Sequence, residues 1–278
     1  MRFKKPHHYQ MSLMIGIFLL CIVITLIAGA SLFSTHDPVE QNVLNRLEAP
    51  NSDHLFGTDR FGRDVFARTL HGGQITLVSS FFTLGVTLII GLFVGLLTGM
   101  FHGSIIDTIF MRIIDVLMAF PFMVFAMMIA ALFGTSLLHL LLAVSIIWWV
   151  PFARLTRSIV LQVKNEVSVE AAQVLGAKTS TIAFRELLPR AIAPVSIQAT
   201  FELGNLILSI SALSFLGLGA QPPAPEWGSM LADGRAHFFE APHILMGPGL
   251  FIILTVLALN LIGEGLRDQL DPFEKLKF

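Results

Sequence analysis

The sequence predicts an all-α polytopic membrane protein. Of its 278 residues, 54% are hydrophobic and only 13% are charged, whereas a soluble domain carries about 25% charged residues. Six apolar stretches are each long enough to cross a bilayer, which requires about 20 residues. They cover residues 12–33, 75–101, 109–133, 137–155, 192–218 and 244–266. The chain is therefore expected to divide into an N-terminal anchor with an outside segment (1–74), a membrane core (75–267) and a tail (268–278).

The first apolar stretch is expected to be a membrane anchor. Basic residues precede it and Ala28-Gly29-Ala30 stands near its end, as in a cleaved secretory signal, but its apolar run is longer than the core of such a signal. The single cysteine, Cys21, lies in this stretch, so the sequence excludes a disulfide within the chain.

The distribution of Lys and Arg predicts the orientation. If the N-terminus is cytoplasmic, 13 of the 18 basic residues lie in cytoplasmic segments and 5 lie outside. The outside ones are Arg46, Arg60, Arg63, Arg68 and Arg235. This is the bias that the positive-inside rule requires. We therefore expect a multi-pass protein of the cytoplasmic membrane, surrounded by lipid, with both termini in the cytoplasm. The formal net charge of −1 gives no indication of a nucleic-acid partner.

A polar, helix-forming island interrupts the apolar chain at residues 163–189. Helix formers fill its first half, and Gly176 is suited to the left-handed conformation that ends a helix. Thr179 or Ser180 can cap a second helix, which Pro189 is expected to end. The predicted structure is a helix, a glycine hinge and a second helix, on the cytoplasmic side.

Six residues of this island carry a family resemblance. They are Glu170, Ala171, Ala172, Gly176, Leu188 and Pro189, at the spacing Glu-Ala-Ala-x3-Gly-x11-Leu-Pro. The pattern resembles the cytoplasmic loop of permease subunits in ATP-binding-cassette (ABC) importers, where this loop is the coupling helix that docks into a groove of the ATPase. Glu186 departs from the pattern, since the family prefers Ile there. An ordinary amphipathic hairpin at the membrane surface is the alternative interpretation.

Further motifs extend the resemblance from residue 54 to the C-terminus. Residues 55–68 are similar to the Leu-Gly-Thr-Asp-x-x-Gly-Arg-Asp signature of dipeptide, oligopeptide and nickel permeases. The proline-rich segment 219–243 and the run from Glu264 to Pro272 are similar to the same subfamily. The resemblance implies a type I ABC importer permease fold, and a cargo of short peptides, glutathione, nickel or other metal complexes.

Individual residues of these outside segments are expected to have structural roles. Thr58 or Asp59 can cap a short helix. Asp59, Arg63 and Asp64 are expected to form local ion pairs rather than to bind cargo. Trp227 is of the residue type that favours the membrane interface.

Three glycines in the second span predict close helix packing. Gly91, Gly95 and Gly99 recur every four residues, so they share one helical face that has no side chains. Packing within this chain is the preferred interpretation, and contact with another subunit is the alternative.

The fifth span carries a polar stripe. Gln198, Glu202, Asn205 and Ser209 lie at i, i+4, i+7 and i+11, the spacing of a single helical face. A carboxylate at the centre of a lipid-facing helix costs roughly 2.5–3.5 kcal/mol, so this face must contact protein or water. We expect the stripe to line the translocation pathway. The alternative is that Glu202 is protonated or paired and holds helices together.

The chain carries no ATP-binding motif of its own. It contains no Gly-x4-Gly-Lys-[Ser/Thr] phosphate loop, so another polypeptide must hydrolyse ATP. No catalytic residue, metal ligand or cofactor is predicted, and the pair His7-His8 is interpreted as part of a solvated terminus. The family resemblance implies a second homologous permease subunit, two ATPase subunits and an extracytoplasmic substrate-binding protein. The competing hypothesis is an ion-gradient-driven secondary transporter that uses Glu202 as its coupling carboxylate.

Overall fold

A computed structural model describes residues 7–270 of the protein. Within this range every named element is helical, and an isolated bridge between Thr58 and Asp64 is the only strand-like pairing. The elements are α1 (His7–Ala28), α2 (Ala30–Phe33), η1 (Val43–Asn45), α3 (Val65–Met100), α4 (Ile105–Ala119), α5 (Phe122–Phe133), α6 (Leu137–Trp148), α7 (Val150–Val163), α8 (Val167–Val174), α9 (Thr179–Ile182), η2 (Ala183–Leu187), α10 (Leu188–Phe215), α11 (Trp227–Gly234), η3 (Arg235–His237) and α12 (His243–Leu270). Arg2, Lys4, Lys5 and residues 271–278 of the predicted tail lie outside the described residues.

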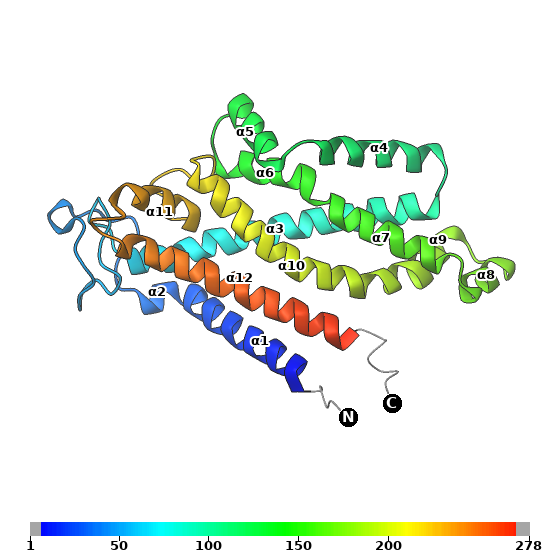
Figure 1. Ribbon diagram of the computed structural model, residues 1–278, viewed down its shortest axis with the longest axis horizontal. Coiled ribbons are helices and arrows are strands. Elements are labelled where there is room, and N and C mark those ends of the chain that lie inside the picture. Colours follow the sequence, from blue (N-terminus) through cyan, green and yellow to red (C-terminus); the bar gives the residue numbers. More distant parts are fainter. Residues whose placement is uncertain (1–6, 271–278) are drawn as a thin grey trace.

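Among residues 7–270, five helices are long and apolar enough to cross a membrane. A bent pair of helices adds a sixth crossing if it is counted as one span. The five are Gln10–Ala28, Val65–Met100, Leu137–Val163, Thr179–Phe215 and His243–Gln269. They run roughly along the long axis of the molecule, and α1 packs beside α12 (Figure 1). The predicted all-α polytopic class is confirmed, and the predicted spans appear in the expected order.

The third predicted span, 109–133, is broken rather than continuous. α4 and α5 meet at an angle of 89°. Pro121 accounts for the break, because its ring cannot continue a helix and disfavours helical geometry in the residue before it. Phe120 is accordingly extended, with φ −91° and ψ 131°. Both halves are apolar, so hydropathy gives no indication of the bend.

α3 begins at Val65, earlier than the predicted start at residue 75. The Asp64 side chain accepts a hydrogen bond from the Ala67 N–H and caps the helix. The expectation that Thr58 or Asp59 caps a helix here is therefore wrong. The predicted boundary between residues 74 and 75 falls inside α3, so the outside segment joins the membrane core through a continuous helix.

The three glycines of the second span face α7. A Cβ added at Gly91, Gly95 or Gly99 would come within 2.4–2.6 Å of atoms of α7. At Gly95 the nearest of these atoms include the backbone carbonyl oxygen of Ala153, at 2.5 Å. The glycine face thus lets two helices of the same chain approach closely.

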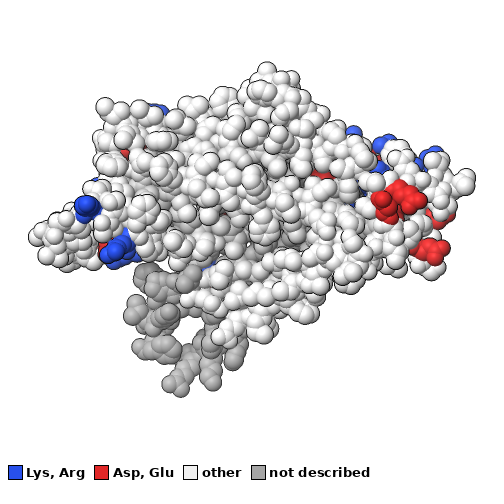
Figure 2. Space-filling model, turned by 180° about the vertical axis from the view of Figure 1, so that it is seen from behind, with Lys and Arg blue, Asp and Glu red and all other residues white. Residues whose placement is uncertain are grey.

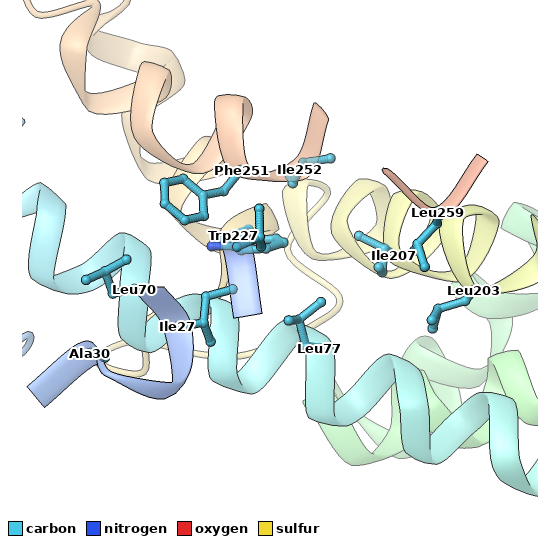
Figure 3. Packing of buried hydrophobic residues seen from close by; sticks show 11 residues of the cluster. Ile27, Ala30, Leu70, Leu77, Leu203, Ile207, Trp227, Phe251, Ile252 and Leu259 are labelled. Carbon is cyan, nitrogen blue, oxygen red and sulfur yellow. The ribbon is translucent and has the colours of Figure 1, made fainter. Parts of the chain in front are cut away.

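Trp227 is a core residue rather than an interfacial one. It is 0% exposed, in a cluster formed by α1, α3, α10, α11 and α12. Its indole N–H donates to the Thr69 carbonyl oxygen at 2.9 Å, which satisfies the polar atom of the ring and permits full burial. Figure 3 shows the ring among Ile27, Leu77 and Phe251. The expectation of an interfacial Trp227 is wrong.

The molecule has two differently built ends. α8 and α9 form one of them, here called the hairpin end, and the start of α1 and the end of α12 point toward it (Figure 1). Residues 34–64 and α11 form the opposite one, the loop end. On the face that Figure 2 displays, charged side chains gather at these two ends and are sparse between them. Large apolar side chains such as Met14, Val78 and Ile89 are 67–69% exposed along the helices between the ends, as expected for a surface that contacts lipid.

Candidate functional site

The first half of the polar island forms the short helix α8 at the hairpin end. Gly176 follows it with φ 81°. The N–H of Gly176 donates to the Gln173 carbonyl oxygen, and the N–H of Ala177 donates to that of Ala172, both at 3.0 Å. These two hydrogen bonds form a Schellman cap, for which a left-handed glycine is the favoured residue. Gly176 therefore ends α8 in the manner that its position suggests.

One face of α8, here called the α8 face, is exposed and largely apolar. Val167, Val174 and Leu175 are 80%, 88% and 85% exposed. Glu170 and Ala171 are also exposed, and the five residues follow the spacing i, i+3, i+4, i+7 and i+8 of a single helical face. Three large aliphatic side chains exposed together at the tip of a molecule are typical of a surface that another molecule covers. The small side chain of Ala171 would let that molecule come close to the helix backbone.

Two contacts tie α8 to the rest of the bundle on its other side. Val169 is 0% exposed and belongs to a cluster with residues of α3, α7, α9 and η2. Just before α8, the Lys164 ammonium donates to the carbonyl oxygen of Met100 at 2.8 Å. This carbonyl lies in the last turn of α3, where it has no helical N–H partner. α8 is thus joined to the end of α3.

Arg190 links α8 to the start of α10. Its guanidinium pairs with Glu166 and donates to the Ser168 hydroxyl oxygen at 3.0 Å. It also lies 3.9 Å from the carboxylate of Glu186, one helical turn earlier. Glu186, which departs from the family pattern, therefore has a cationic neighbour and takes part in this link.

The chain does not end a helix at Pro189. α9 passes through the π-helical turn η2 directly into α10, and in this turn the N–H of Leu188 donates to the Ala183 carbonyl oxygen. Pro189 then occupies the first turn of α10, where a missing N–H costs little. The predicted helix stop is wrong for this reason. Neither Thr179 nor Ser180 is the N-cap of α9, which begins without a side-chain cap.

The six predicted docking residues differ in exposure. Glu170, Ala171, Gly176 and Pro189 are exposed, and Ala172 and Leu188 are half-buried. Four of them lie in α8 or its cap, whereas Leu188 and Pro189 open α10. The pattern omits the three aliphatic residues of the α8 face, which sequence reasoning missed.

The polar stripe of α10 is only partly enclosed by this chain. Glu202 is 9% exposed, and its Oε1 accepts a hydrogen bond from Nε2 of Gln198 at 2.8 Å. Asn205 is exposed and Ser209 is half-buried. The hydrogen bond of Glu202 lies within its own helix, so it does not by itself join two helices.

α12 contributes a polar residue that contacts another face of α10, at Gly204. A Cβ added at Gly204 would lie 3.9 Å from Oδ1 of Asn260, and Asn260 is exposed like Asn205. The sequence shows Asn260 as a lone asparagine within the apolar stretch 244–266. That it lies against Gly204 of α10 depends on how the two helices pack, which the sequence does not show.

A buried ion-pair network holds the loop end together. The Nε of Arg63 lies 2.6 Å from Oδ2 of Asp59, and the Nε of Arg68 lies 3.6 Å from the same oxygen. Arg63 also reaches Asp233 of α11 at 3.4 Å. Arg63 and Asp59 are 1% and 4% exposed, so the network is structural, whereas Asp64 caps α3 instead. These contacts join the outside segment, α3 and α11.

The described residues form a bundle of membrane-length helices with a short exposed helix at one end and a partly enclosed polar stripe on α10, which is the architecture of a polytopic membrane protein. Comparisons with known proteins identify the family to which the chain belongs. Residues 91–275 match the family described as binding-protein-dependent transport system inner membrane component. The chain belongs to this family, and it is a permease subunit of a binding-protein-dependent ABC importer, a multi-pass protein of the inner membrane.

Two relatives and one solved structure illustrate the likeness. The chain is 42% identical over 258 residues to the dipeptide transport system permease protein DppC of Alkalihalophilus pseudofirmus, covering 93% of this chain and 84% of that protein. It is 41% identical over 271 residues to the glutathione transport system permease protein GsiD of Escherichia coli, covering 98% and 88%. Its fold is similar to a chain of the MetNI methionine ABC transporter in an inward-facing conformation, with a TM-score of 0.54 and 21% identity over 72% of this chain and 95% of that chain.

Membership of this family bears on catalysis, on the energy source and on the cargo. The chain is not itself an enzyme. An ABC system supplies energy through an ATPase partner rather than an ion gradient, and a binding protein delivers its cargo. The two relatives named above are called dipeptide and glutathione permeases, and neither name supports nickel as cargo.

Proposed function

We propose that the α8 face is the coupling site of this permease and docks into a groove of the ATPase partner. The exposure of Val167, Val174 and Leu175 carries this proposal. They lie on a helix whose other side is anchored through Val169. Glu170 lies among the apolar residues of the α8 face. Its charge would be unfavourable against lipid, so this face is better suited to bind a protein surface than to contact lipid.

The contacts of α8 provide a route by which ATP-driven movement reaches the membrane. Val169 packs α8 into a cluster with α3, and Arg190 connects the start of α8 to α10. When two ATPase subunits close on ATP, a displacement of α8 moves the ends of both helices. The complete importer, in this proposal, contains a second homologous permease subunit, two ATPase subunits and an extracytoplasmic substrate-binding protein.

The orientation follows from the same assignment. An ATPase is cytoplasmic, so the hairpin end faces the cytoplasm and the loop end faces the binding protein. The start of α1 and the end of α12 point toward the hairpin end (Figure 1), which supports cytoplasmic N- and C-termini, with residues 268–278 as a cytoplasmic tail.

We propose that the polar stripe of α10 lines the translocation path. The exposure of Asn205 on a single chain supports this role, because polar groups on a membrane helix must face protein or water. The second permease subunit would cover the stripe from the other side.

We propose short peptides, of the dipeptide or glutathione type, as the cargo. The names of two relatives that are 41–42% identical over more than nine-tenths of this chain support this class. The ligand retained by the purified binding protein identifies the cargo directly, and a ligand that is not a peptide would contradict the proposal.

A tryptophan at Ala171 tests the coupling site, with Gln173 as a matched control. Both residues are exposed and lie on α8, but Gln173 points away from the α8 face. Ala171→Trp should abolish co-purification of the ATPase with the permease and ATP-dependent uptake, while Gln173→Trp should retain both. Retention of the ATPase by Ala171→Trp, or its equal loss in both variants, would place the docking surface elsewhere.

A further inference from the structure

Three potential metal ligands converge at the loop end, although they are distant in the sequence. Oδ2 of Asp64 lies 2.8 Å from Nδ1 of His54 and 4.0 Å from Nδ1 of His36. The two imidazole rings are 4.8 Å apart between centroids. One ligand atom from each residue lies within 4.8 Å of the other two.

These separations are within about 1.5 Å of those in a tetrahedral metal-ligand set. Nitrogen and oxygen ligands bind Zn²⁺ at about 2.0–2.2 Å, which in tetrahedral geometry separates the ligands by about 3.4 Å. The observed 2.8 Å, which is a hydrogen-bond distance, lies below this value and the observed 4.0 Å lies above it. Metal binding therefore widens the His54–Asp64 pair and draws in His36, whose side chain is 39% exposed.

Two of the three side chains are already held in position. Oδ1 of Asp64 accepts the N–H of Ala67 at 2.6 Å, which turns Oδ2 toward the histidines. The His54 ring lies within hydrogen-bonding distance of Oδ2 of Asp64, at 2.8 Å from Nδ1, and His54 is 9% exposed. Fixed ligands reduce the entropy lost on binding, so the third ligand only has to join a formed half-site.

The surroundings favour a cation. A pocket of about 290 Å³ adjoins the three residues, and it is also lined by the carboxylates of Asp37, Glu40 and Asp53. No Lys or Arg is among its lining residues. A pocket lined by charges of one sign concentrates ions of the opposite sign. The pocket also leaves room for a water molecule as the fourth ligand of a metal ion.

We propose that His36, His54 and Asp64 bind a divalent first-row transition-metal ion, for which we take Zn²⁺ as the probe. Imidazole nitrogens select such ions over Mg²⁺ and Ca²⁺, which prefer oxygen ligands alone. The bound ion joins the segment that follows α2 to the start of α3. It thereby stabilises the segment between α2 and α3. The site is independent of the coupling and cargo assignments.

Equilibrium dialysis of the purified importer complex against Zn²⁺ tests the site. The complex is isolated through a tag without histidine, and His7 and His8 are changed to Gln because that pair is a second candidate ligand set. His36→Gln is the main variant, since its exposed side chain makes it compatible with folding. His54→Gln is the second variant. His237→Gln is the matched control, because this loop-end histidine lies 3.6 Å from a lone carboxylate, that of Glu240.

The parent complex should bind one Zn²⁺ per permease chain. His36→Gln and His54→Gln should each lower the affinity for Zn²⁺ by about tenfold or more, and His237→Gln should leave this affinity unchanged. Zn²⁺ should also slow proteolysis within residues 37–53 in the parent protein but not in His36→Gln. Equal Zn²⁺ binding by the parent and His36→Gln overturns the proposal. Binding of Mg²⁺ as tight as that of Zn²⁺ also overturns it, because an acidic pocket alone would then explain the result.

Discussion

The guanidinium of Arg157 donates two hydrogen bonds to the carboxylate of Asp107, from Nε at 2.9 Å and from Nη2 at 3.0 Å. The same carboxylate accepts the N–H of Gly103 at 3.0 Å, and its Oδ2 lies 2.8 Å from Nδ1 of His102. Asp107 is 4% exposed. The pair joins the start of α4 to α7, so it fixes the first half of the bent pair to the bundle.

Asp107→Asn should lower the free energy of unfolding by about 1–3 kcal/mol, because it leaves the Arg157 guanidinium, which is 22% exposed, without its anionic partner. Asp115→Asn is the matched control on the same helix. Asp115 lies 3.4 Å from Arg154, but both side chains are about half exposed, so its loss should cost less than about 1 kcal/mol. Denaturant unfolding of the purified permease in detergent measures both, and equal effects would contradict the structural role of Asp107.

Gly95→Ala and Gly85→Ala should act in opposite directions. A Cβ at Gly95 would lie 2.5 Å from both the Ala153 carbonyl oxygen and the Thr156 Cβ, whereas a Cβ at Gly85 would meet nothing within 4 Å. Forcing α3 and α7 apart should cost about 1–3 kcal/mol, while alanine at the open position should stabilise the helix by up to about 1 kcal/mol. The thermal unfolding temperatures of the two variants provide the measurement, and a stable Gly95→Ala variant would show that α7 is not held so closely.

Gly176→Ala should weaken coupling without removing the α8 face. The left-handed conformation of Gly176 costs an alanine about 1–2 kcal/mol, although no atom lies near enough to clash with a Cβ. Gly176→Asn is the matched control, because asparagine tolerates this conformation better. ATP-dependent uptake by reconstituted importer should fall in the alanine variant and recover in the asparagine variant. The same uptake in wild type and Gly176→Ala would show that the cap is not needed for coupling.

Glu202→Gln should reduce uptake while the assembled importer remains at its normal level, if the stripe of α10 lines the path. The amide keeps the shape of the side chain and its hydrogen-bonding capacity toward Gln198, but it removes the charge. Glu240→Gln, at an exposed carboxylate of the loop end, is the control and should leave uptake unchanged. Loss of the assembled complex in Glu202→Gln would instead support the alternative that this residue holds helices together.

Glu226 should give the stability of the loop end a dependence on pH. Burial raises the pKa of the Glu226 carboxyl above its ordinary value of 4.5, although hydrogen bonds from the N–H groups of Gly228 and Ser229 and from the Thr76 hydroxyl oppose the shift. Because the folded pKa is the higher one, folding takes up a proton between the two values. Stability should therefore rise as the pH falls from the raised pKa to 4.5, and gain nothing further from this group below that value.

Thermal unfolding across this pH range compares wild type with Glu226→Gln, which cannot ionise. The variant should lose the part of the pH dependence that comes from this carboxyl. An identical pH profile in the two proteins would mean that the carboxyl keeps the same pKa in the folded and unfolded states.

Hydropathy and local propensity were sufficient to predict the helical class, the order of the spans and the end of α8 at Gly176. Each depends on residues close together in the sequence. The break at Pro121 was not predicted, because residues 109–133 are apolar on both sides of the proline and the neighbouring elements decide the angle of a kink. Pro189 shows the opposite case, since the wider turn of η2 lets a residue that usually ends helices begin one.

Tertiary contacts limited what could be predicted of the candidate sites. Trp227 has the amphipathic character of an interfacial residue, and only the position of the Thr69 carbonyl makes full burial favourable. His36 and His54 are isolated in the sequence, and they approach Asp64 only because the outside segment folds back on the start of α3. The exposure of Val174 and Leu175 likewise depends on where α8 is anchored.

The packing of α1 against α12 has a consequence for biosynthesis. A Cβ at Gly16 would lie 2.8 Å from the Ala258 carbonyl oxygen, and one at Gly265 would lie 2.6 Å from the Cβ of Leu13. α1 leaves the ribosome first among the described helices, yet its closest neighbour is the last to be synthesised. The nascent protein must therefore keep α1 in the bilayer with α3 as its neighbour, and without α12, while all the helices between them are synthesised.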